Sequence, residues 1–382
     1  SGGSGPAGRG AAGAGKRTLM AKRILITGHR GYIGSVMVPY FLRAGYEVQG
    51  ADTGFFECCL IGSGGGEIEG HRLDLRDGLT ARELEGIDAV IHLAALSNDP
   101  IGNLNERWTR EINGDAAVRL AQAAREAGVS RFLFSSSCIM YGAAGGGETE
   151  VNESSPLDPR TQYARSKVEA ENALRPLAAP SFSPVYMRNG TIYGLSPRMR
   201  FDTVLNSLAG SAVARGSVCV FSDGKPWRPV VHVDDVCAAF HAALEAPREA
   251  VHNEAFNVGA AEVNVQIGAL ARHVAEASGA SLELLAQADA DQRSYRTSFA
   301  KIARHLPGFR LQWSPRAGAE RLVREFRALG LSGDQFDDAR FTRLRWLRKL
   351  LEEGALGEDL RWRVSGQAAA CGVRAEAEEV TA

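Results

Sequence analysis

Three residues in the middle of the chain have side chains suited to proton transfer: Ser137, Tyr163 and Lys167. Tyr163 and Lys167 have the i, i+4 spacing that places two side chains on one face of a helix. An ammonium group there would lower the pKa of the phenol, which at its ordinary value of about 10 is too high for a base at neutral pH. The Ser137 hydroxyl, at the end of a strand-like segment, would bond the same substrate oxygen. Because a Tyr-x-x-x-Lys pair alone is a common surface pattern, its meaning depends on the other motifs.

A glycine-rich turn near the start of the chain provides the second motif. Apolar residues 24–26 lead into the segment 27–34, TGHRGYIG, which has glycine at three positions. An amphipathic segment follows. This order predicts a strand, a tight turn and a helix N-terminus that holds the pyrophosphate of a dinucleotide. Glycine is required because a side chain would block the approach of the backbone to the phosphates. The predicted cofactor-binding residues of this turn are Gly28, Arg30, Gly31, Tyr32, Ile33 and Gly34, although a glycine turn without a ligand is the alternative.

An acidic residue, Asp52, ends the next strand-like segment, 47–51. A carboxylate at this point accepts hydrogen bonds from both ribose hydroxyls of NAD and would repel the 2′-phosphate of NADP. NAD is therefore the expected cofactor. Arg30 points the other way, because a guanidinium in the turn could reach a 2′-phosphate, so NADP stays a less favoured alternative.

Alternating strand-like and helical segments must position these residues. Strands are expected at 24–26, 47–51, 89–94, 131–136 and 185–187, and helices at 116–127 and after Pro159. This alternation predicts an α/β fold, a Rossmann-type doubly wound parallel sheet with helices on both faces. Ligands of such sheets bind at the carboxyl ends of the strands.

Beyond about Asn189 the strands become shorter and glycine and proline increase, which predicts a smaller, partly interleaved C-terminal substrate lobe. Residues 230–235 and 255–259 are expected to return to the main sheet as strand ends. The predicted organisation is a flexible leader or tag (1–19), an NAD-binding Rossmann domain (20–188, with returning segments near 228–260), a substrate-binding lobe (189–330), and a helical extension with a flexible tail (331–382). Residues 340–351 predict an amphipathic basic helix packed on the lobe with a solvated arginine face.

The composition excludes several classes of protein. Lys and Arg number 44 and Asp and Glu 45, a net charge of −1, so no basic field would recruit nucleic acid or a membrane surface. The chain has neither a long apolar run typical of a membrane helix nor a secretory signal. Six cysteines without metal-ligand spacing predict reduced thiols, no metal site and a cytoplasmic location.

Together these motifs resemble the extended short-chain dehydrogenase/reductases, and among them the NAD-dependent nucleotide-sugar epimerase/dehydratase family, over roughly residues 22–323. The resemblance implies that Ser137, Tyr163 and Lys167 are the catalytic triad, with Tyr163 and Lys167 also contacting the cofactor. It further implies cofactor-binding roles for Asp74 and Leu75 near the adenine, for Leu93, Ala94 and Ala95 along the cofactor, and for Asn113, which would brace the active-site helix.

The resemblance also implies a nucleotide-diphosphate sugar as substrate. Asn189 would open the sugar-nucleotide pocket, and Arg228 and Arg293 would each bind the diphosphate through two parallel hydrogen bonds. Ser97 and Asn98 either bind sugar hydroxyls or cap the following helix. The loop 198–200 is expected to influence substrate choice, and a homodimer is expected by analogy with the family.

Three functions stay open at this stage. The leading hypothesis is an epimerase that transiently oxidises and re-reduces a sugar carbinol, with C4 preferred. A keto-sugar reductase, supported by Arg30, and a non-catalytic sensor of NAD or sugar nucleotide are the alternatives. The family's dehydratases have Asp-Glu directly after the catalytic serine or threonine, whereas this chain has Cys138-Ile139, so dehydration is disfavoured. Cys138 is expected to be a packing thiol, with an acid/base role as a minor alternative.

Overall fold

In the computed structural model, residues 22–62, 68–144, 149–285 and 294–363 are described. The predicted leader, the end of the tail, Cys371 and Arg293 lie outside these ranges. The centre of the molecule is a seven-stranded sheet with the order β11-β7-β5-β4-β1-β2-β3. Every neighbouring pair in it is parallel. Its strands are β1 (Arg23–Thr27), β2 (Glu47–Asp52), β3 (Gly70–Arg72), β4 (Ala89–His92), β5 (Arg131–Ser137), β7 (Ser183–Asn189) and β11 (Glu254–Val258).

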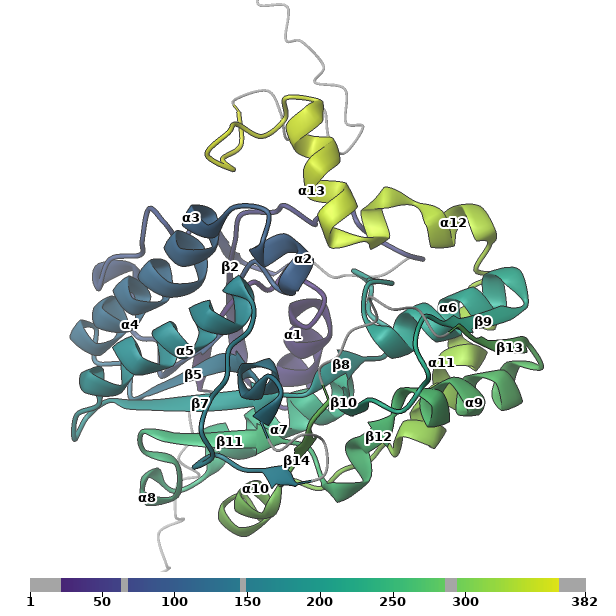
Figure 1. The fold of residues 1–382 in the computed structure, drawn as a ribbon. Helices are drawn as coiled ribbons and strands as arrows, with labels where there is room; N and C mark the ends of the chain where they lie inside the picture. Colours follow the sequence, from purple (N-terminus) through teal and green to yellow (C-terminus); the bar gives the residue numbers. More distant parts are fainter. Residues whose placement is uncertain (1–21, 63–67, 145–148, 286–293, 364–382) are drawn as a thin grey trace, which may run out of the picture.

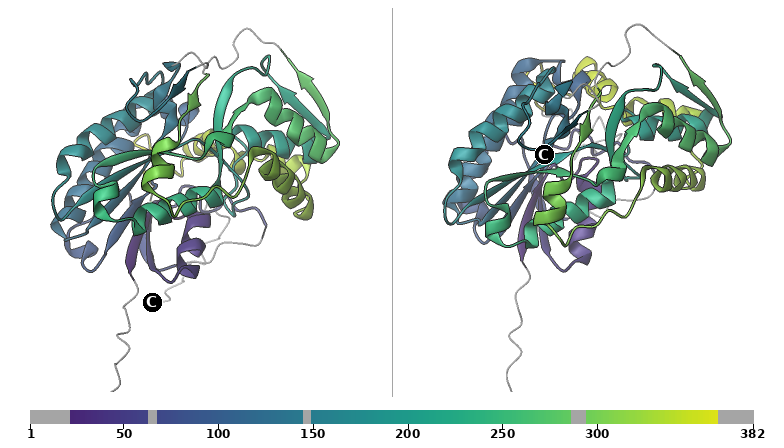
Figure 2. Two further views of the ribbon diagram at one scale, coloured as in Figure 1. Left: turned by 90° about the horizontal axis from the view of Figure 1, so that it is seen from below. Right: turned by 60° about the horizontal axis from the view of Figure 1, so that its bottom comes forward.

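Helices cover both faces of this sheet, which confirms the predicted Rossmann-type fold (Figures 1 and 2). On one face, α1 (Gly34–Arg43) and α7 (Val233–Glu245) share an apolar core with the strands. On the other face, α4 (Ala116–Glu126) and α5 (Gln162–Leu174) do the same. Strands covered on both sides are buried along their length, as all residues of β4 and β7 are.

Shorter elements connect these units. They are η1 (Arg82–Leu84), α2 (Asp99–Gly102), α3 (Glu106–Thr109), the π-helical turn η2 (Arg110–Asp115), η3 (Cys138–Tyr141), η5 (Arg175–Leu177), α8 (Arg248–Val251), η6 (Ala261–Val263) and α10 (Ala300–His305). Two further strands, β6 (Glu150–Val151) and β14 (Arg296–Thr297), form a parallel pair.

The strand order reverses at β1, which lies between β2 and β4. Loops that leave the carboxyl ends of β1 and β4 therefore diverge to opposite faces, and the crevice between them is where such sheets bind ligands. Thr27, Asp52, His92, Ser137 and Asn189 are the last residues of β1, β2, β4, β5 and β7. The topology thus brings the predicted site residues of several strands to one edge.

A second unit lies beside this edge (Figure 1). Its helices are α6 (Val204–Arg215), α9 (Ile267–Ser278) and α11 (Pro315–Ala328), and its strands are β8 (Thr191–Tyr193), β9 (Ser217–Val220), β10 (Trp227–His232), β12 (Asn264–Gln266) and β13 (Ser281–Leu284). Its core includes Leu205, Leu270 and Phe326, one from each helix. We call this unit the lobe.

The prediction that residues 230–235 return to the main sheet was wrong. Residues 230–232 end β10, which pairs in parallel with β8 and antiparallel with β12 in a separate three-stranded sheet, and residues 233–235 begin α7. The strand β11 and the helix α7 do return to the Rossmann unit. An apolar β-forming run specifies a strand but not its partner, and β8, which follows directly after β7, offers the nearer edge.

The C-terminal part also differs from the expectation. A basic helix is present as α13 (Arg343–Glu352), preceded by α12 (Gly333–Asp337) and η7 (Ala339–Phe341). However, α13 packs on the Rossmann unit rather than on the lobe, and its arginine face is solvated only in part, since Arg345 and Arg348 are exposed. It crosses toward α2 and α3 of the Rossmann unit, as Figure 1 shows, and Arg343 is buried.

The cysteine expectation holds only in part. Cys59, Cys138, Cys219 and Cys237 are free thiols, but Cys58 is disulfide-bonded. The prediction was wrong at Cys58 because sequence spacing constrains only local pairing, whereas a disulfide requires proximity in space. Across the described ranges, no helix has both the length and the apolar character that a bilayer crossing requires.

Candidate active site

A cavity of about 770 Å³ lies between the carboxyl edge of the sheet and the lobe. Most of the residues predicted from sequence line it: Gly28, Gly31, Tyr32, Ile33, Gly34, Asp52, Asp74, Leu75, Leu93, Ala94, Ala95, Ser97, Asn98, Ser137, Tyr163, Lys167, Asn189 and Arg228. Arg30 and Asn113 are not in its wall. One space therefore contains both the predicted cofactor turn and the predicted proton-transfer group.

The glycine turn is packed too tightly for side chains. Gly28 has φ +72°, and a Cβ there would lie 2.8 Å from the backbone nitrogen of Ala94. A Cβ on Gly34 would lie 2.3 Å from the carbonyl oxygen of Gly28. The helix α1 starts at Gly34, which lines the cavity together with Gly28 and Gly31, so the N-terminus of this helix lies at the cavity wall. This cradle fits a dinucleotide diphosphate.

At the end of β2, Asp52 is held by two backbone amides. Its Oδ2 accepts from the Arg30 N–H at 2.9 Å, and its Oδ1 accepts from the Gly54 N–H at 2.7 Å. The Arg30 guanidinium is directed elsewhere, because its Nη1 donates to Glu57 at 2.8 Å, and Arg72 bonds the same carboxylate. The observation that kept NADP as an alternative is thereby weakened, since Glu57 engages the guanidinium that would have bound a 2′-phosphate.

Asp74, after β3, lines the cavity and is paired with Arg76, whose Nη2 lies 2.5 Å from Oδ2. Asn113 stands behind the cavity wall. Its Oδ1 accepts from the Leu96 N–H at 2.8 Å, and its Nδ2 donates to the Ser166 hydroxyl of α5 at 3.1 Å. Its predicted role in cofactor binding stays a prediction, and these bonds connect it to the helix that it is expected to brace.

The helix α5 positions the proton-transfer group. Thr161 caps it by accepting the Ala164 N–H at 3.2 Å, and Tyr163 follows in the first turn. Lys167 Nζ lies 5.8 Å from the centroid of the Tyr163 ring and donates to the Ser135 carbonyl at 2.8 Å. The predicted i, i+4 pair thus shares one face of the helix, with the end of β5 alongside it.

The pKa values of this pair depend on burial. Burial raises the pKa of Tyr163 to about 12, against the charge of Arg200 and a hydrogen bond with Ser137, which lower it. Burial lowers the pKa of Lys167 to about 7, partly offset by the charge of Glu171. The nearby charge that lowers the pKa of Tyr163 is that of Arg200. The expected effect of Lys167 on this phenol stays a prediction.

Arg200 belongs to the loop that sequence reasoning singled out, although its role was not foreseen. It is 8% exposed, its Nε donates to Asp202 Oδ1 at 2.6 Å, and its Nη1 donates to the Ser97 hydroxyl at 3.1 Å. The capping alternative for Asn98 agrees with the structure, because its Oδ1 accepts from the Ile101 N–H at 3.2 Å at the start of α2. Its Nδ2 donates to Asp202 Oδ2 at 3.1 Å, so Asn98, Asp202, Arg200 and Ser97 form one hydrogen-bonded network in the cavity wall.

The substrate side of the cavity is formed by β7, β10 and the lobe. Arg228, 8% exposed, has its guanidinium 5.7 Å from the ring centroid of Tyr295. Asn189, at the end of β7, donates to the Ser135 hydroxyl at 3.1 Å. The second predicted diphosphate arginine, Arg293, lies outside the described residues, so its placement stays a prediction.

Cys138 faces away from this chemistry. Its Sγ donates to the Arg188 carbonyl at 3.1 Å in a fully buried environment. Burial raises the pKa of this thiol to about 12. It has the surroundings of a packing residue, as expected, and it does not line the cavity.

The lining residues that were missed from sequence include Phe55, Phe56 and Arg343. The two phenylalanines follow Asp52 closely, so an aromatic pair after the acidic residue was an available signal. No local pattern indicated Arg343, because it reaches the cavity from the C-terminal helix α13.

A glycine turn after β1, an acid at the end of β2 and a Tyr–Lys pair on the helix after β5 define a short-chain dehydrogenase/reductase of the extended type. The model of the NAD dependent epimerase/dehydratase family matches residues 24–259, and the chain belongs to this family of enzymes. The family and fold expected from sequence are confirmed, and NAD is the cofactor.

Relatives of known activity include both reaction types. The chain is 30% identical to the UDP-glucose 4-epimerase of Mycolicibacterium smegmatis over 251 residues. This matched region covers 62% of this chain and 77% of that protein. The structure of a Thermotoga maritima UDP-glucose 4-epimerase with UDP-glucose is similar with a TM-score of 0.68 and 26% identity, covering 80% of this chain and 99% of that chain. The structure of a dTDP-glucose 4,6-dehydratase from Streptomyces venezuelae with NAD bound is similar with a TM-score of 0.69 and 27% identity. The match covers 82% of this chain and 99% of that chain.

Proposed function

We propose that this chain is an NAD-dependent epimerase that inverts a carbinol carbon, C4, of a nucleotide-diphosphate sugar. The observation that carries the proposal is the placement of Tyr163, Ser137 and the glycine turn around one cavity whose other wall holds Arg228. Relatives among UDP-glucose 4-epimerases support the nucleotide sugar as substrate class.

Bound NAD would supply hydride removal and return at the sugar carbon. Tyr163 takes the proton of the reacting hydroxyl as a phenolate, and Ser137 orients the same oxygen by a hydrogen bond. Lys167, buried against Phe134 with its Nζ 4.7 Å from the ring centroid, would bond the ribose next to the nicotinamide. Arg228 would bind the sugar diphosphate, so the nucleotide stays attached while the sugar presents either face.

Three features favour epimerisation over the alternative functions. The residues after Ser137 are Cys138, which is buried against Arg188, and Ile139, which lines the cavity, so this position has no carboxyl group to eliminate water. The reductase alternative depended on Arg30, which is bonded to Glu57. The intact Tyr163 and Lys167 speak against a sensor without catalysis.

The test is a screen of UDP-, GDP-, dTDP- and CDP-hexoses with NMR analysis of the products. We expect inversion at one carbon without net consumption of NAD. A 4-keto-6-deoxy product would indicate a dehydratase, and stoichiometric use of NADPH would indicate a reductase. Tyr163→Phe should abolish turnover while the purified protein still contains NAD. Failure of every nucleotide sugar to bind would refute the proposed substrate class.

A further inference from the structure

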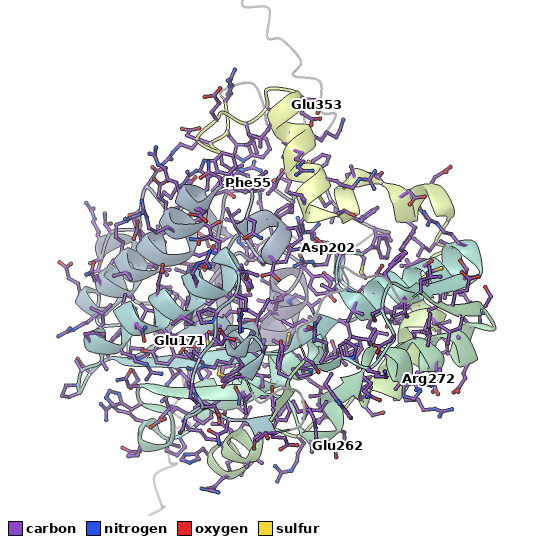
Figure 3. The ribbon with its side chains drawn as sticks, in the orientation of Figure 1. Phe55, Glu171, Asp202, Glu262, Arg272 and Glu353 are labelled. Carbon is purple, nitrogen blue, oxygen red and sulfur yellow. The ribbon has the colours of Figure 1, made fainter. Side chains whose placement is uncertain are left out.

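The segment that follows the lobe, residues 332–363, crosses the molecule. It contains α12, η7, α13 and a final turn, and it lies beyond the residues 24–259 that the family model matches. In Figure 1 α12 lies near α6 of the lobe, whereas α13 lies above α2. Figure 3 places Phe55 and Asp202 below α13 and Glu353 at its far end. We call residues 332–363 the strap.

The first half of the strap is attached to the lobe. Phe341 is 2% exposed, its ring centroid lies 5.8 Å from that of Phe201, and its carbonyl accepts from the Phe201 N–H at 2.8 Å. Asp337 forms an ion pair with Arg215 of α6. Aromatic burial together with a backbone bond makes this the fixed end of the strap.

The second half of the strap holds the loop after Asp52. The indole N–H of Trp346 donates to the Phe55 carbonyl at 2.7 Å, and that of Trp362 donates to the Thr53 carbonyl at 2.7 Å. Thr53 and Phe55 line the cavity. The apolar cluster between strap and Rossmann unit contains Phe55, Cys59, Leu96, Ile101, Trp108, Trp346, Leu347, Leu350, Ala355, Leu356 and Leu360.

The strap is also linked to the predicted adenine side of the cavity. Arg76 pairs with Asp74 and at the same time donates to the carbonyls of Asp359 at 2.6 Å and Leu360 at 2.9 Å. One guanidinium therefore joins the cavity wall after β3 to the end of the strap.

Between its two attachments, the strap places a buried cation in the cavity wall. Arg343 lines the cavity and is 2% exposed. Its Nη2 donates to the Arg198 carbonyl at 2.7 Å, its Nη1 donates to the Arg340 carbonyl at 3.2 Å, and its guanidinium lies 4.5 Å from the ring centroid of Phe56. These three partners are neutral. The nearby carboxylate of Asp202 accepts from the Arg343 backbone N–H at 3.2 Å, but it is shared with Arg200, whose Nε donates to it at 2.6 Å. Two buried guanidiniums thus lie near one carboxylate, and a phosphate-bearing ligand in the cavity would stabilise the second positive charge.

We propose that the strap locks NAD into the cavity, with Trp346 and Trp362 as positioning residues for the loop after Asp52 and Arg343 as part of the wall. NAD then leaves only after the second half of the strap detaches from the Rossmann unit. This inference rests on NAD as the cofactor and does not depend on which sugar reaction follows. A strap that holds NAD in place would keep the same NAD bound throughout epimerisation, in which the hydride removed from the sugar must be returned to it.

The experiment measures NAD release without any sugar. Holoenzyme freed of unbound NAD is mixed with excess isotopically labelled NAD, and mass spectrometry follows the unlabelled NAD that stays bound. Trp346→Phe and Trp362→Phe should each accelerate release about fivefold, and the double variant more, because each loses one hydrogen bond to the loop. Trp313→Phe is the matched control, since within the described residues the Trp313 Nε1 has no hydrogen-bond partner.

Melting temperatures of the same variants separate strap detachment from general unfolding. Unchanged NAD release in a folded double variant would overturn the proposal, as would an equal acceleration in Trp313→Phe. If the double variant does not fold, hydrogen exchange of the unaltered protein gives the answer: backbone amides of 341–363 should exchange more slowly with NAD bound than after its removal. Equal exchange in both states would overturn it. Because no sugar is present in either measurement, a failed epimerase assay leaves both results interpretable.

Discussion

Arg200 is the side chain whose charge most strongly opposes the effect of burial on Tyr163. Tyr163 must lose its proton before it can accept one, so removing this charge raises the phenol pKa. We expect Arg200→Met to move the rising limb of kcat/KM to higher pH by on the order of one unit. The measurement is the pH dependence of kcat/KM for the substrate found in the screen. Arg272→Met, on the exposed surface of α9, is the control and should leave the limb in place.

A pair of glycines with positive φ separates backbone strain from ligand contact. A Cβ on Gly28 (φ +72°) would clash with the backbone of Ala94, whereas a Cβ on Gly45 (φ +87°) would have no neighbouring atom within 4 Å. Alanine at either position should lower the free energy of unfolding by about 1–2 kcal/mol through the left-handed backbone. Only Gly28→Ala should also lose bound NAD, because its methyl group displaces the cradle. NAD content of the purified variants and urea denaturation measure the two effects, and equal NAD content would contradict this interpretation of the turn.

Among the elements, α5 depends on its N-cap to place Tyr163. Thr161 accepts the Ala164 N–H and donates to Asp99 Oδ1 at 2.5 Å, which ties α5 to α2. Thr161→Val keeps the shape but removes both bonds, so we expect a loss of about 1 kcal/mol in stability. A fall in kcat of roughly tenfold should accompany it through displacement of the phenol.

Ser314 provides the matched comparison, because it caps α11 in the same way by accepting the Ala317 N–H at 3.2 Å. Ser314→Ala should cost similar stability and leave kcat unchanged. Both variants are compared by thermal unfolding and by steady-state kinetics. A kcat loss of the same size in Ser314→Ala would mean that the effect at Thr161 is only one of stability.

The elements that sequence predicted are those whose information is local. The glycine turn, the strands around it and the helix with Tyr163 each follow from patterns within one or two dozen residues. The sheet that β10 joins and the course of α13 could not be predicted, because they depend on distant partners: Trp346 bonds Phe55, 291 positions earlier. The same holds for the charge near Tyr163, since Arg200 approaches it only through the fold of the lobe.

At the scale of the whole molecule, the cavity exists only because two units face each other, so the contacts between them matter for stability. Asp235, on α7 of the Rossmann unit, is one such contact. Its Oδ1 accepts from the Gln312 N–H at 2.8 Å and its Oδ2 accepts from the Trp313 N–H at 3.1 Å, in the segment that leads into α11 of the lobe. The carboxylate is fully buried at this junction.

This junction should give the protein a measurable dependence on pH. Burial raises the pKa of Asp235 from 3.8 to about 6, although the two amides act in the opposite direction. The folded protein therefore holds this proton more tightly than the unfolded chain. The contribution of Asp235 to the free energy of unfolding falls as pH rises from about 4 to about 6, and is constant above that window.

The variant Asp235→Asn tests this dependence, because an asparagine side chain does not titrate. In urea denaturation, the unfolding free energy of the unaltered protein minus that of Asp235→Asn should decrease across the same pH window. The exposed Asp115→Asn serves as control, and a difference for Asp235→Asn that does not change with pH would show that this carboxyl group is not desolvated at the junction.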